Sequence, residues 1–132
     1  MNTVVALLLL PTTPPFTRAI PTTDSFYRGF IGGELEVHNG ATVDGSRAVF
    51  YSHSESERLQ LPLNLNATRL LHYLSQTAEE LRGAVLVTGV YGVGDADVPT
   101  SVVHLVLTLH NESLLAESVR RTHAMNAAVE TP

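Results

Sequence analysis

The sequence contains no cysteine, no tryptophan and no lysine, so all eight of its basic residues are arginine. The absence of cysteine excludes disulfide bonds, zinc sites built on thiolates and catalysis by a cysteine nucleophile. The formal net charge is −5 at pH 7, and the arginines are scattered along the chain. Because nucleic-acid binding requires a cationic footprint, we predict no nucleic-acid partner.

Long apolar runs are also scarce. Val4–Leu10 is apolar over seven residues, whereas a membrane-spanning helix needs about 20. No basic residue precedes this run, and Pro11 follows it instead of a small-residue cleavage site. We therefore predict no membrane partner and no secretion by a signal peptide, with the protein in the cytoplasm or in a virion.

The pattern of residues 66–110 predicts the centre of a single domain that covers residues 1–132. Leucines at helical spacing indicate a helix over 67–82, with Asn66 as its N-cap and Gly83 as its left-handed end. Residues 84–91 are apolar on both sides and predict a central strand, followed by a glycine-rich loop. Alternating apolar residues then predict an antiparallel strand over 102–110.

Shorter patterns complete the predicted fold. Residues 3–10 indicate a buried strand, and residues 34–53 indicate a hairpin or meander with Asn-Gly and Asp-Gly turn signals. Residues 59–65 indicate a short strand or extended edge, and 112–128 a final helix. The predicted class is α+β, with a mainly antiparallel sheet covered by two helices.

Residues 11–33 are predicted to be an extended Pro/Thr-rich arm or long loop. Four prolines alternate with threonines, which argues against a helix or a central strand. Large apolar groups also stud the segment, and we expect them to dock either on the domain's own core or on a partner. The candidate partner-binding residues are Phe16, Ile20, Phe26, Tyr27 and Phe30.

No motif predicts a catalytic, cofactor or metal site. On a strand, His104 and His110 would lie about 20 Å apart, and His38 and His53 lack the spacing of metal ligands. The serines around His53 are typical of a polar turn. We therefore predict no structural metal, and a stability that does not respond to a chelator.

Three functional readings follow. The first is a non-enzymatic structural or assembly protein, such as a viral or phage capsid accessory, decoration or connector protein. It would dock on protein subunits through the arm and form an oligomer. The alternative is an oligomeric small-ligand-binding enzyme or binding domain, with a pocket near His104, Tyr91 and the loop Gly92–Asp97. A peptide-binding adaptor that uses a free sheet edge is a third reading.

Overall fold

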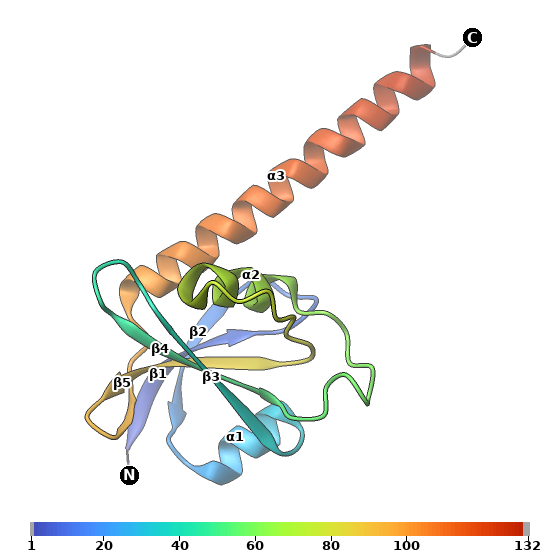
Figure 1. Ribbon diagram of the computed structural model, residues 1–132. Helices are drawn as coiled ribbons and strands as arrows, with labels where there is room; N and C mark the ends of the chain where they lie inside the picture. The colour runs from blue at the N-terminus through green and yellow to red at the C-terminus, as the bar shows by residue number, and fades with distance from the viewer. Residues whose placement is uncertain (1, 131–132) are drawn as a thin grey trace.

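The computed structural model describes residues 2–130, with side chains up to residue 124 (Figure 1). Its strands and helices, in chain order, are β1 (Thr3–Leu9), β2 (Phe16–Pro21), α1 (Asp24–Ile31), β3 (Leu35–Ala41), β4 (Arg47–His53), α2 (Leu65–Ser75), β5 (Val85–Tyr91), β6 (Gly94–Ala96) and α3 (Thr100–Glu130). The predicted α+β class is confirmed, with three helices among the described residues.

The strands form one antiparallel sheet in the order β2-β1-β5-β4-β3, and β6 pairs with β5. Strands β1 and β5 are apolar on both sides because both faces of the sheet are covered. Leu7 and Val87 face one core cluster, and Leu8 and Leu86 face the other. The predicted strands 3–10 and 84–91 are therefore confirmed.

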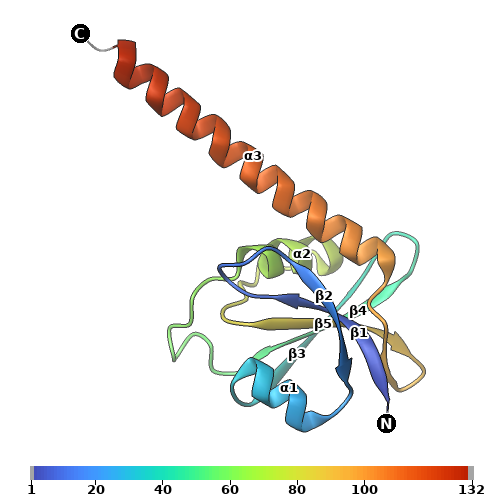
Figure 2. The same ribbon diagram turned by 180° about the vertical axis from the view of Figure 1, so that it is seen from behind.

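The helices divide between the two faces, as Figures 1 and 2 show from opposite sides. Helix α1 covers one face, where Ile20, Tyr27 and Ile31 belong to its core cluster. Helix α2 and the first turns of α3 cover the other face, around Phe50, Leu70 and related side chains. The remainder of α3 extends away from the body.

The prediction that residues 11–33 contain no helix was wrong. Strand β2 takes an edge position in the sheet, where Pro21 does not interrupt an inner ladder. Helix α1 follows, with the Thr23 side chain accepting from the Phe26 N–H and Gly32 at φ 93° ending it. All four prolines precede α1. The prediction applied the proline content of the first part to the whole segment and therefore missed the short capped helix that follows.

Helix α2 starts and ends earlier than predicted. Asn64, not Asn66, is its N-cap, and Gln76 at φ 57° is its C-cap. Leu81 was expected to continue the helical stripe; it is buried, but it lies outside the helix. The Leu81 N–H donates to the Thr68 hydroxyl at 2.9 Å, and the Leu81 carbonyl accepts from the Asn64 N–H. These tertiary hydrogen bonds replace the helical ones.

The predicted strand 102–110 was also wrong, because these residues form the first turns of α3. Val102, Val106 and Leu109 are buried and follow helical spacing. The same region also contains apolar residues at alternate positions, so both periods fit. The predicted helix 112–128 is present as the continuation of this one helix.

The predicted hairpin over 34–53 is confirmed as β3 and β4, with the turn at residues 42–46 and Gly45 at φ 88°. The predicted strand at 59–65 reduces to one bridge between Leu63 and Arg82. Among the described residues, no helix combines the length and apolar character needed to cross a membrane.

Candidate functional site

The five predicted partner-binding residues divide into two groups. Ile20 and Tyr27 are buried against this chain's own sheet. Phe16 is 41 % exposed, and the rings of Phe26 and Phe30 stack with centroids 6.5 Å apart. These three phenylalanines line a shallow apolar hollow of about 410 Å³ between β2 and α1. The structure thus places three candidates on one surface and two in the core.

Tyr27 also joins a cluster that holds the β6 hairpin in place. Its hydroxyl donates to Asp95 at 2.7 Å, and the Tyr51 hydroxyl donates to the same carboxylate at 2.8 Å. Burial and the hydrogen bond with Asp95 raise the pKa of Tyr27, and the same causes raise the pKa of Tyr51. This cluster has a structural role, because its polar groups satisfy one another.

The residues predicted to line a pocket near His104 are mostly exposed. His104 is exposed on α3, and Tyr91 is 85 % exposed at the end of β5. The predicted loop Gly92–Asp97 contains β6, which pairs with β5, and only Gly92 and the fully exposed Val93 form the tip of this hairpin. His104 and His110 do not share a face, because six residues of helix turn through more than one and a half turns.

Helix α3 is anchored where it leaves the body. Arg69 of α2 donates to the Leu109 carbonyl at 3.1 Å and to the Ser113 hydroxyl. The Arg69 guanidinium also lies 3.8 Å from the Glu112 carboxylate. Beyond this anchor, every described side chain from Asn111 to Ala124 is exposed or half-buried. Residues 111–130 extend about 30 Å at 1.5 Å per residue.

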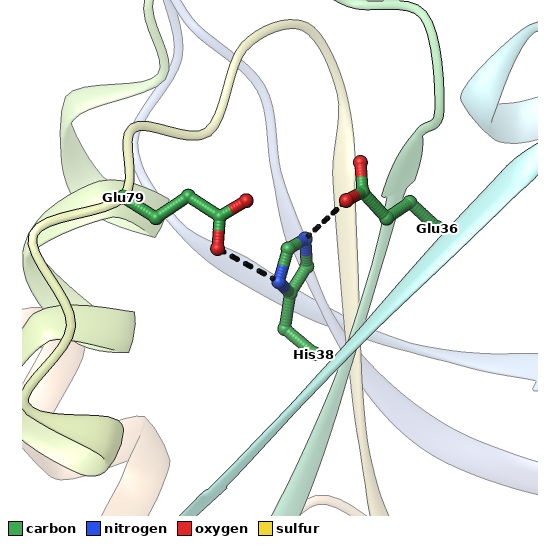
Figure 3. Close-up of side chains that lie close together, drawn as sticks. All are labelled: Glu36, His38 and Glu79. Atoms are coloured by element: carbon green, nitrogen blue, oxygen red, sulfur yellow. Dashed lines mark ion pairs between the residues drawn. The ribbon is translucent and has the colours of Figure 1, made fainter.

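A polar cluster lies on the face of the sheet that α2 covers. The register places Glu36 opposite Ser52 and His38 opposite Phe50, so all four point toward the same face. Glu79 reaches the cluster from the segment after α2 (Figure 3). The His38 ring lies between two carboxylates: Nδ1 is 3.4 Å from Glu79 and Nε2 is 4.0 Å from Glu36. Its side chain is 11 % exposed.

A hollow of about 360 Å³ adjoins this cluster, and its lining is strongly acidic. Five glutamates and one arginine contribute to it: Glu36, Glu55, Glu57, Glu79, Glu80 and Arg58. Arg58 pairs with Glu55 and lowers the pKa of that carboxyl, and Arg82 pairs with Glu80 at 3.2 Å. Neither Glu36 nor Glu79 forms an ion pair with an arginine among the described residues.

The cluster has the order of a Ser–His–carboxylate triad, with the Ser52 hydroxyl 3.4 Å from Nε2 of His38. Two features argue against a nucleophile. Ser52 is only 2 % exposed, and the Glu36 carboxylate faces the same ring nitrogen, where it would repel a developing oxyanion. His53 is not its base either, since Nδ1 of His53 accepts from the Glu55 N–H at 3.0 Å.

Sequence reasoning missed this cluster. The alternation over residues 34–38 does place Glu36 and His38 on one strand face, and that signal was available. Glu79 gave no signal, because it was assigned to a helix that ends at Ser75. Comparisons with models of known families, with curated proteins and with solved structures found no match to this chain.

Proposed function

We propose that this chain is a non-enzymatic assembly protein whose first partner is a second copy of itself, paired through α3. The observation that carries the proposal is the part of α3 beyond Ser113, where every side chain described, up to residue 124, is exposed or half-buried. Isolated helices of this length are marginal in water, and most helical stability comes from packing an apolar face. A partner along α3 would supply that packing.

The exposed apolar side chains of α3 lie on a different side of the helix from its buried ones. Leu107 and Leu114 are seven residues apart, and Leu115 and Val119 are four apart, which sets them along one side of the helix. Their exposed fractions are 40 %, 52 %, 66 % and 47 %. Because this side turns away from the face that packs on the sheet, it is free to meet another helix.

The charge order along α3 favours an antiparallel pair. Over residues 112–121, Glu112 and Glu117 come first and Arg120 and Arg121 follow, with Glu117 already paired with Arg121 at 2.6 Å in the same helix. An antiparallel arrangement sets the acidic part of each helix beside the basic part of the other, whereas a parallel one aligns like charges. The antiparallel arrangement also brings the end of the partner helix toward a hollow of about 900 Å³ at the point where α3 leaves the body. Leu114 lines this hollow.

Sedimentation or light scattering tests the proposal. We expect a mass of twice 14.3 kDa, and we expect the double variant Leu114→Ser/Leu115→Ser to be a folded monomer. The matched control is Leu59→Ser/Leu63→Ser, which changes two exposed leucines that do not line the hollow where α3 leaves the body and should remain dimeric. A monomeric wild-type chain at high concentration would contradict the proposal.

Docking on a larger particle is the wider form of this proposal, with the protein in the cytoplasm or in a virion as an accessory, decoration or connector component. The surface formed by the exposed Phe16 and the half-buried Phe26 and Phe30 supports a second protein contact of this kind. Co-sedimentation with assembled particles tests it. The variant Phe16→Ser/Phe30→Ser should lose particle association while keeping the α3-dependent dimer.

A further inference from the structure

We propose that Glu36, His38 and Glu79 form a binding site for one Zn²⁺ ion. One ligand atom from each of the three residues lies within 4.8 Å of the other two. Zinc binds imidazole nitrogen and carboxylate oxygen at about 2.0–2.2 Å, which sets neighbouring ligands somewhat over 3 Å apart. The cluster is therefore open by up to about 1.5 Å relative to a bound zinc ion.

One zinc ion binds only one ring nitrogen of His38, and the two carboxylates face different ones, so a carboxylate has to move around the ring to close the site. Their side chains are 45 % and 47 % exposed, and each has three rotatable bonds. His38 is the fixed member, since it stands on a paired strand with its ring largely buried. The Ser52 hydroxyl beside Nε2 is placed to orient the ring, as outer-shell partners of metal-binding histidines do.

The charge of the surroundings favours a cation. The acidic hollow beside the cluster has five glutamates, and its arginine is already paired with Glu55. Bringing Glu36 and Glu79 to the same imidazole concentrates negative charge that no arginine offsets among the described residues. The hollow also leaves room for water at the fourth position, which a site with three protein ligands requires.

The ligand set favours zinc over magnesium or calcium. Imidazole suits Zn²⁺ and its neighbours in the transition series, whereas Mg²⁺ and Ca²⁺ prefer oxygen ligands alone. Binding would join β3 to the segment after α2, which Thr68 and Asn64 already hold through Leu81. Zinc would therefore stabilise the folded state, and this proposal revises the prediction that stability does not respond to a chelator.

Titration of the chelator-treated full chain with ZnCl₂ tests the site. We expect calorimetry to show one equivalent bound, a rise in Tm that saturates with it, and no comparable rise with MgCl₂. The variants Glu36→Gln and Glu79→Gln keep the side-chain shape at half-exposed positions, so they should fold normally. Each should weaken zinc binding at least tenfold.

The matched control is the double variant Glu57→Gln/Glu80→Gln, which removes two charges from the same hollow but no proposed ligand. It should bind zinc nearly as tightly as the wild type. The proposal fails if zinc does not bind, if MgCl₂ raises Tm equally, or if the control weakens binding as much as Glu36→Gln and Glu79→Gln. In that last case the acidic hollow attracts cations without a specific site.

Discussion

Asn64 joins three parts of the chain through one buried side chain. Its Oδ1 accepts from the Ala67 N–H and so caps α2. Its Nδ2 donates to the Leu9 carbonyl at 2.9 Å and to the Gly83 carbonyl at 2.8 Å. The side chain thus satisfies a helix end and the ends of two neighbouring strand segments where water has no access, since Asn64 is 1 % exposed.

We expect Asn64→Ala to lower the free energy of unfolding by about 2–4 kcal/mol. The lost cap accounts for about 1 kcal/mol, and two buried carbonyls left without a donor account for most of the rest. Urea denaturation measures the loss. The control is Asn66→Ala, because Asn66 lies inside α2 and its amide is 3.1 Å from Nδ1 of the half-buried His110; a loss as large there would contradict the assignment.

The difference between Asn64 and Asn66 shows what a sequence pattern predicts at this scale. Both asparagines precede the same leucine stripe, and both are good N-cap residues. The sequence therefore predicts that a helix starts here but not at which asparagine. The choice depends on the carbonyls of Leu9 and Gly83, which come from distant parts of the chain.

At the scale of elements, local pattern predicted β1, β3, β4, β5, α2 and the later part of α3, but not β2, β6 or α1. Strands β1 and β5 are recognisable because both faces are apolar. Residues 102–110 satisfy the strand period and the helical period together, and the outcome follows from the buried contacts of Val102, Val106 and Leu109. The spacing of apolar residues alone does not decide whether such a segment forms a strand or a helix.

The polar cluster of His38 was unpredictable for a related reason. Glu36 and His38 share a strand face, which alternation indicates. Glu79 lies 41 residues after His38 in the sequence, and it reaches the ring because α2 ends at Ser75 and the chain turns back. A site built across such a turn needs the tertiary structure.

Two variants in β2 test the division of the predicted partner-binding residues into buried and exposed ones. We expect Ile20→Ala to cost about 2–5 kcal/mol, because Ile20 is fully buried and its truncation leaves a cavity. Phe16→Ala should cost about 1 kcal/mol or less, because the ring is already 41 % exposed. Denaturant titration of both variants at one protein concentration measures this, and equal losses would contradict the division.

The composition of the whole molecule simplifies its alkaline titration. With no lysine and no cysteine, tyrosines are the side chains of the unfolded chain that titrate between about pH 9 and 12, since arginine stays protonated. With no tryptophan, the near-ultraviolet absorbance also reports tyrosine alone. Tyr27 and Tyr51 donate to Asp95 in the folded protein, whereas Tyr73 and Tyr91 are exposed.

We expect the free energy of unfolding to fall as the pH rises above about 10. The folded pKa values of Tyr27 and Tyr51 are raised, so between the unfolded pKa near 10 and the folded one the native state holds more protons than the unfolded state. Stability is then complete below pH 10 and is lost above it, by at most about 1.4 kcal/mol per pH unit for each tyrosine. Tyr51 contributes less than this limit, because it is partly exposed.

Urea unfolding between about pH 8 and 11, which brackets the ordinary tyrosine pKa, measures how steeply stability falls with pH. Tyr27→Phe and Tyr51→Phe should each lower stability at pH 8, because Asp95 loses a hydrogen-bond donor, and each should flatten the decline above pH 10. The control Tyr73→Phe/Tyr91→Phe should leave both unchanged. If the Tyr27→Phe curve runs parallel to the wild-type curve, the cluster does not hold its tyrosines neutral, and its role would reduce to apolar packing between α1, β4 and β6.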